Sequence, residues 1–120
     1  MAQTTEAVTK TFTSLSDPLR RYVLYYLDEE APVSIDRLAT RVAAWHTDST
    51  PEAVDEDTVT EMRAALYHMH LPKLEQYGYI ERKKDAREVA KGPRFEETRP
   101  LLEWVDDHAE VADQSDYSFA

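Results

Sequence analysis

Cysteine is absent from this 120-residue chain, and glycine occurs only twice. Without cysteine, the protein cannot form disulfide bonds or bind a metal ion through thiolates. Two glycines are too few for a glycine-rich phosphate loop, and the sequence contains neither a nucleophile elbow nor a His-Glu-x-x-His pair. We therefore predict no enzyme activity, no catalytic residues and no cofactor.

Long hydrophobic runs are also absent. No apolar segment approaches the roughly 18 residues that a membrane-spanning helix needs, and residues 1–6 lack the basic and then apolar order of a signal peptide. A chain of 120 residues is long enough for one modest hydrophobic core. We expect a single-domain cytoplasmic protein that does not bind membranes.

Positive charge is scarce. The chain has 14 Lys and Arg residues against 24 Asp and Glu residues, which gives a net charge of −10. This balance disfavours nucleic-acid binding, because Lys and Arg are the residues that neutralise phosphates. The charges are unevenly distributed, however. Residues 82–99 contain half of the basic residues, whereas residues 100–120 contain several acids and no Lys or Arg.

Arg outnumbers Lys, and acidic residues are spread over every predicted solvent-facing surface. This pattern favours a protein adapted to a salt-rich cytoplasm; the alternative is an ordinary acidic mesophilic domain. In molar salt the screening length falls to about 3 Å, so only charges in direct contact with DNA would affect binding. The net charge lowers the expectation of DNA binding without excluding it.

Residues 64–81 read as a helix that continues almost directly into a strand. Gly78 supplies the left-handed conformation that commonly ends a helix, and Tyr79-Ile80 begins a run that favours extended backbone. Pro72 lies inside the helix and cannot donate a backbone hydrogen bond, so we expect a kink there. The helix is expected to begin near Asp57-Thr58, and Val59, Met62, Leu66 and Met69 form one predicted buried stripe. Within 64–81, Leu66, Met69 or His70, and Leu74 recur at helical spacing.

The remaining elements follow from caps and periodicity. A short amphipathic helix is predicted over 6–15, and Asp17-Pro18 begins a second helix. Ser34 caps a third helix, and an acidic insertion follows at 46–57. Strands at 79–84 and 87–90 are joined by a turn at 85–86, and a last helix is expected over 100–112.

Two blocks, in this order, resemble winged helix-turn-helix regulators of the arsenic-repressor type. The run LSDPLRRYVL at 15–24 is similar to the L-x-D-P-x-R-x-x-I-L opening of that group, and LPKLEQYGYIE at 71–81 is similar to the end of its recognition helix and its first wing strand. The HLPKL variant at 70–74 resembles small winged-helix domains of halophilic archaea. The resemblance covers roughly residues 10–105, and the insertion at 46–57 departs from the short turn of the group.

The fold that this resemblance implies is mainly α with a small β-hairpin, a winged helix-turn-helix with extra N- and C-terminal helices. We expect a disordered N-terminus at 1–5 and a winged-helix domain at 6–112. Within this domain, the wing occupies about 79–91 and a C-terminal dimerisation helix occupies about 100–112. An acidic flexible tail is expected at 113–120.

The resemblance also implies a dimeric, DNA-binding transcription regulator. The helix 58–76 would read the major groove of double-stranded DNA, and the wing at 82–87 would hold the phosphate backbone or enter the minor groove. Which of Tyr67, His68, Met69 and His70 faces DNA is left open, and a solvated hairpin without a DNA role is the alternative for the wing. The expected DNA-binding residues are Arg63, Tyr67, His68, His70, Lys73, Arg82, Lys83, Lys84 and Arg87.

Apolar residues near both ends predict a homodimer contact. The expected interface residues are Val8, Phe12, Leu101, Trp104, Val105 and His108. Asp106-x-His108 resembles half of a zinc-sensing pattern whose second half is missing at 117–119, so we predict no metal site. The alternative function is a winged-helix protein-interaction module that binds no nucleic acid and contacts its partner through the acidic insertion and the last helix.

Overall fold

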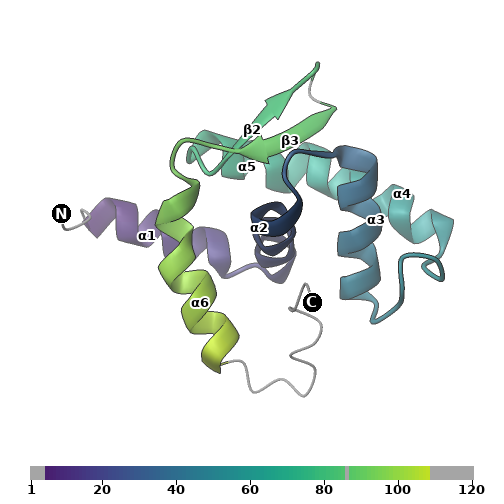
Figure 1. Cartoon of the computed structure of the whole chain (residues 1–120), viewed down its shortest axis with the longest axis horizontal. Coiled ribbons are helices and arrows are strands. Elements are labelled where there is room, and N and C mark those ends of the chain that lie inside the picture. Colours follow the sequence, from purple (N-terminus) through teal and green to yellow (C-terminus); the bar gives the residue numbers. More distant parts are fainter. Residues whose placement is uncertain (1–4, 86, 109–120) are drawn as a thin grey trace.

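The computed structural model describes residues 5–85 and 87–108 (Figure 1). The predicted acidic tail, residues 1–4, Ala86 of the predicted turn and the part of the predicted last helix beyond His108 lie outside the described residues. In chain order, the elements are α1 (Thr5–Leu15), α2 (Pro18–Glu30), β1 (Val33–Ser34), α3 (Ile35–His46), α4 (Glu56–Ala65), a π-helical turn (Leu66–His70), α5 (Leu71–Gln76), β2 (Ile80–Lys83), β3 (Glu88–Lys91), a 3-10 helix (Phe95–Thr98) and α6 (Arg99–His108).

Helices make up most of the described chain, and the strands form one small antiparallel sheet of order β1-β3-β2. In the register of the sheet, Val89 of β3 lies between Val33 of β1 and Arg82 of β2. The helices α1 and α6 lie on one side of the central helix α2, and α3 and α4 lie on the other (Figure 1). The predicted class, a mainly α winged helix-turn-helix with a small hairpin and additional terminal helices, is confirmed. No helix of the described residues is long and apolar enough to cross a membrane.

Both helix N-caps that the sequence predicts are present in the structure. The Asp17 side chain accepts a hydrogen bond of 2.8 Å from the Leu19 amide, with Pro18 in the first turn of α2. Ser34 caps α3 by accepting from the Arg37 amide at 3.1 Å. Ser34 also belongs to β1, a strand that we did not predict because two residues are too short to show periodicity.

The core is built around α2. Six consecutive residues, Tyr22 to Leu27, are buried, so neighbouring elements cover this helix on every side. The Tyr22 and Tyr26 rings pack against Trp45 with centroid distances of 5.7 and 6.0 Å. On the α6 side, the Tyr25 hydroxyl donates to the Leu102 carbonyl at 2.9 Å. The central helix therefore holds both the helix-turn-helix and the C-terminal helix.

The two glycines meet at the base of the hairpin. Gly78 ends α5 with a φ of +83°, and the next amide, of Tyr79, returns to the Leu74 carbonyl at 3.0 Å. A Cβ atom at Gly92 would lie 2.4 Å from the Gly78 carbonyl oxygen, which is closer than real Cβ atoms approach. The chain leaving the wing can therefore pass the end of α5 only because position 92 has no side chain.

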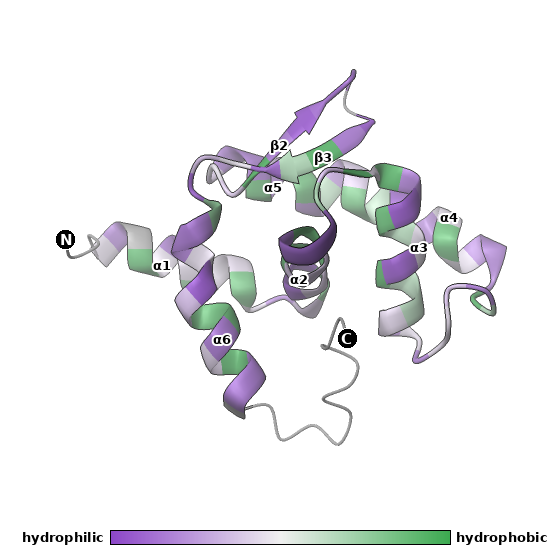
Figure 2. Ribbon diagram, in the orientation of Figure 1, coloured by the Kyte–Doolittle hydropathy of each residue, from purple (hydrophilic) through white to green (hydrophobic). Residues whose placement is uncertain are grey.

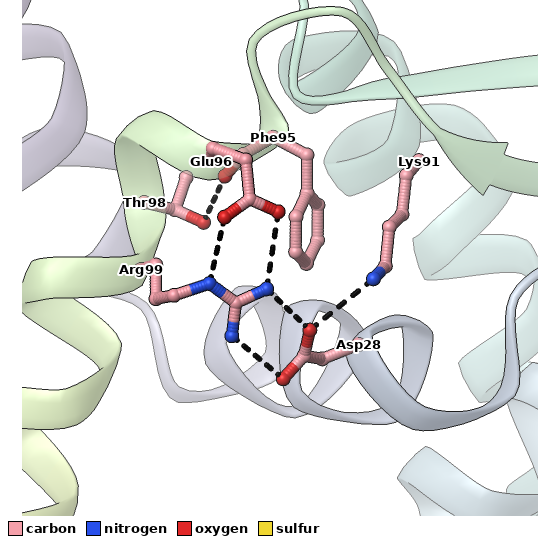
Figure 3. A network of polar contacts seen from close by, with 6 residues as sticks. All are labelled: Asp28, Lys91, Phe95, Glu96, Thr98 and Arg99. Carbon is pink, nitrogen blue, oxygen red and sulfur yellow. Dashed lines mark hydrogen bonds and ion pairs between the residues drawn. The ribbon is translucent and has the colours of Figure 1, made fainter.

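Asp28 of α2 joins the wing to the last helix (Figure 3). Its carboxylate accepts from Arg99 Nη2 at 2.7 Å and Nη1 at 3.1 Å, and from Lys91 Nζ at 3.3 Å. Arg99 also donates to the Glu96 carboxylate from Nε at 2.7 Å. The hydrogen bond from Arg99 is the main reason that the pKa of Asp28 lies below its ordinary value.

We predict that Asp28→Asn lowers the free energy of unfolding by roughly 1–2 kcal/mol at neutral pH. Because the pKa of Asp28 is lower in the folded state, its contribution is present above the ordinary Asp pKa of 3.8 and is lost as pH falls through the folded pKa. Urea unfolding should therefore show a difference between the variant and the wild type that shrinks in acid. Asp48→Asn, in an exposed loop, is the control; a penalty for Asp28→Asn that is the same at every pH would contradict this account.

Candidate nucleic-acid interface

A π-helical turn interrupts the long helix that runs from Glu56 to Gln76. The Leu71 amide hydrogen-bonds to the Leu66 carbonyl, five residues back instead of four. We expected a kink at Pro72; the irregular turn lies directly before it. The extra residue in the turn changes which face of the following segment is buried.

This change makes one part of the predicted stripe wrong. Met62 and Leu66 are buried as expected, but the Met69 side chain is 60% exposed. After the π turn, the core is filled by His70, Leu71 and Leu74. In a regular helix both position 69 and position 70 would lie on the same face as Leu66. With the wider turn, His70 is in the core and Met69 is exposed.

The same turn settles which of the four residues at 67–70 face solvent. Tyr67, His68 and Met69 are exposed, whereas His70 is 3% exposed. The prediction that His70 binds DNA is therefore wrong, because its imidazole points into the protein. Tyr67 packs edge-on against His68 at 5.2 Å, and the Arg82 guanidinium lies 5.6 Å from the centre of the Tyr67 ring.

His70 connects the long helix to the beginning of α2. Its Nδ1 accepts a hydrogen bond of 3.3 Å from Arg20 Nε and lies 3.9 Å from the Asp17 carboxylate. Burial is the largest influence on the imidazole and lowers its pKa below 6.5; Asp17 opposes this effect and Arg20 adds to it. Since Arg20 can donate only to an unprotonated Nδ1, the neutral imidazole is the form that suits this contact.

A surface groove of about 570 Å³ lies where the beginning of α3, the long helix and the residue before β3 meet. The Ile35 amide of α3 donates to the Arg87 carbonyl at 3.0 Å and joins two of its walls. Sequence reasoning missed the contribution of the first turn of α3, which is visible only once the helices are packed. The residues that line the groove are Ser34, Ile35, Asp36, Thr60, Arg63, Ala64, Tyr67, His68 and Arg87.

The structure brings together only some of the predicted DNA-binding residues. Arg63, Tyr67, His68 and Arg87 line the groove. Arg82 lies beside it on the Tyr67 ring, and Lys83 and Lys84 are exposed at the hydrophilic far end of the hairpin (Figure 2). Lys73 is half-buried with its Nζ 5.8 Å from the centre of the Tyr77 ring, and it does not line the groove.

Most basic residues of this surface have a carboxylate partner. Arg63 pairs with Asp36 at 3.0 Å and Arg82 with Glu75 at 2.9 Å. Weaker pairs join Lys83 to Glu81 at 3.8 Å and Lys84 to Glu88 at 3.7 Å. Arg87 is exposed, and within the described ranges no carboxylate oxygen lies within 4 Å of its guanidinium.

The residues predicted for a dimer contact lie on α1 and α6, which are adjacent (Figure 1). Phe12 and Trp104 are each 57% exposed, and Val8 is exposed to a smaller degree. Leu101 and Val105 are half-buried, and the side chain of His108 is outside what the structure describes. No three Asp, Glu or His side chains of the described residues are grouped to hold a metal ion.

The order of helices and strands, with the hairpin beside the long helix, defines a winged-helix domain. The chain belongs to the family described as a domain of unknown function, DUF7344, which matches residues 12–90. That match includes every residue of the groove and excludes α6. Neither a curated protein nor a solved structure matches the chain.

We predict that the buried His70 makes the protein less stable as pH is lowered from about 7.5 to about 5.5. Its pKa is lower in the folded state, so its contribution is complete above the ordinary value of 6.5 and is lost as pH falls through the folded pKa. Urea unfolding of His70→Leu should show a weaker dependence on pH across this range. His68→Leu, which removes an exposed imidazole from the same turn, is the matched control. Equal pH dependence in wild type and His70→Leu would contradict the prediction.

Proposed function

We propose that the protein is a dimeric, DNA-binding transcription regulator of the winged-helix type, as its resemblance to the arsenic-repressor group implies. The observation that carries the proposal is the groove, where Arg63, Tyr67 and His68 of the long helix lie on the same surface as Arg87 of the wing. These side chains come from two elements that winged-helix proteins use on DNA. A solvated hairpin alone would not require the helix to present polar and aromatic side chains beside it.

The long helix would lie in the major groove of double-stranded DNA. Arg63 can donate a pair of hydrogen bonds to a guanine edge once it leaves Asp36, while Tyr67 and His68 can contact neighbouring bases or phosphates. The wing would lie on the adjacent backbone, where Lys83 and Lys84 have long side chains that can reach phosphates. His70 has no part in this contact and instead holds the helix against α2.

The first test is a titration of the purified protein into labelled genomic fragments, including the region upstream of its own gene, at potassium chloride concentrations up to molar. Saturable binding that competitor DNA does not displace supports the regulator. Absence of binding at every salt concentration would contradict it and would favour the protein-interaction module.

The triple variant Lys83→Gln, Lys84→Gln, Arg87→Gln should bind the selected fragment on the order of 10- to 100-fold more weakly. The slope of log affinity against log salt concentration should fall by up to about 0.9 for each lost phosphate contact. Fluorescence anisotropy across a salt series measures both quantities. Lys10→Gln on α1, which lies away from the tip of the hairpin (Figure 1), is a control that should bind like the wild type. Unchanged affinity of the triple variant would show that the wing does not grip DNA.

The dimer would form through α1 and α6. Phe12 and Trp104 expose large apolar surfaces on adjacent helices, and such surfaces favour association. Two wings placed by a two-fold axis would double the basic surface presented to a symmetric or repeated DNA site.

Replacing Phe12 with Glu should convert the dimer to a monomer, because a charge would be buried in an apolar contact. Sedimentation equilibrium gives the mass in solution. Met69→Glu introduces the same charge at a comparably exposed apolar residue of the long helix and should leave the dimer intact. A wild-type protein that is monomeric at all concentrations, or a Phe12→Glu variant that is still dimeric, would rule out this interface.

A further inference from the structure

The surface proposed to face DNA carries its own acidic groups next to its basic ones. Four basic side chains of the long helix and the hairpin lie within 4 Å of a carboxylate, and the acidic partners come from α3, α5, β2 and β3. These partners are Asp36, Glu75, Glu81 and Glu88.

We propose that three of these carboxylates, those of Asp36, Glu81 and Glu88, pair with basic side chains in the free protein, in the place of DNA phosphates, and so set the DNA affinity. This inference rests on the proposed DNA-binding function. A phosphate that approaches Lys83 or Lys84 must displace a carboxylate, and the displaced carboxylate stays on the same surface and repels the phosphate. The acidic side chains therefore reduce the affinity for DNA in two ways. They compete with the phosphate for the lysines, and they repel the phosphate once it is bound.

The geometry of the pairs allows such an exchange. The side chains of Asp36 and Glu81 are 79% and 49% exposed in their pairs, and Glu88 is 25% exposed beside a Lys84 side chain that is 74% exposed. Ion pairs in contact with water are weak. The Lys83 and Lys84 pairs are also long, at 3.8 and 3.7 Å. Arg82 differs, because it donates to Glu75 Oε1 from both Nε and Nη2 and lies over the Tyr67 ring. Arg82 consequently stays with the protein, while the two lysines are available for exchange.

This arrangement changes how DNA binding depends on salt. Each phosphate contact normally releases about 0.9 of a condensed cation from the duplex, which makes affinity fall with rising salt. When a carboxylate is displaced, it attracts a cation from solution, and this uptake cancels part of the release. The dependence on salt should thus be weaker than the number of basic residues suggests.

Arg87 is the exception on the wing. It has no carboxylate partner among the described residues, it lines the groove with Arg63, and its carbonyl is held by the Ile35 amide. A phosphate can bind Arg87 without displacing anything. Of the basic side chains on the hairpin, Arg87 should therefore contribute most to DNA affinity.

The test compares Glu81→Gln, Glu88→Gln with wild-type protein on a mixed-sequence DNA duplex across a series of potassium chloride concentrations. We expect the double variant to bind roughly threefold to tenfold more tightly. The slope of log affinity against log salt concentration should be steeper by the equivalent of about one to two phosphate contacts. In the same assay, Arg87→Gln should lose more affinity than Lys84→Gln. Unfolding in urea checks that each variant is folded.

The control is Asp48→Asn, Asp106→Asn, which changes the net charge by the same amount. Both residues are exposed. Asp48 follows the end of α3, which the 12 residues of that helix place about 18 Å from the first turn that meets the wing, and Asp106 lies in the last turn of α6, away from the hairpin (Figure 1). That distance exceeds the screening length of about 8 Å at physiological salt, so the control should bind like the wild type.

The possible results distinguish the competition by carboxylates from the DNA-binding function on which it rests. Tighter and more salt-sensitive binding by the hairpin variant, with no change in the control, supports the proposal. If wild-type protein binds DNA and the hairpin variant binds no better than the control, the inference is wrong and the regulator stands. If no variant binds at any salt concentration, the regulator and this inference both fail.

Discussion

A single backbone hydrogen bond, from the Leu71 amide to the Leu66 carbonyl, decides what the long helix presents to its surroundings. In the π turn that it closes, position 70 is in the core and Tyr67, His68 and Met69 are in solvent. The buried His70 then lies against Arg20 and Asp17, so that the exposed face of the helix is held at a defined angle to α2. π turns inserted in regular helices are frequent at functional sites. Here the turn lies beside the groove that carries the proposed function.

Two different sets of contacts hold the hairpin to the rest of the protein. At its base, Gly92 passes close to the end of α5, an approach that leaves no room for a side chain. On the other side, Lys91 and Arg99 meet at Asp28, so α2 links the end of β3 to the beginning of α6. The proposed DNA-binding surface and the proposed dimer surface are therefore attached to the same central helix. A two-fold arrangement of α6 would fix the spacing of the two wings through this connection.

The charge of the whole chain is a poor guide to its local electrostatics. A net charge of −10 disfavours contact with DNA, yet the hairpin and the long helix place several basic groups on one surface. The acids on that surface are paired with these bases, which leaves Arg87 as the basic group with no carboxylate partner in the part of the wing that the structure describes. Because only charges near a phosphate act strongly on it, the arrangement within a few ångströms matters more than the total.

The sequence by itself determined the features that depend on neighbouring residues: the caps at Asp17 and Ser34, the glycine that ends α5, and the order of the helices and the two hairpin strands. These signals are local, since a cap or a left-handed glycine involves residues only a few positions apart. Tertiary structure alone decided the π turn, the burial of His70, the two-residue strand β1 and the pairing of Arg63 with Asp36, which are 27 positions apart. Such features arise when distant segments pack together, and a helical period read along the chain cannot anticipate a turn that adds one residue to it.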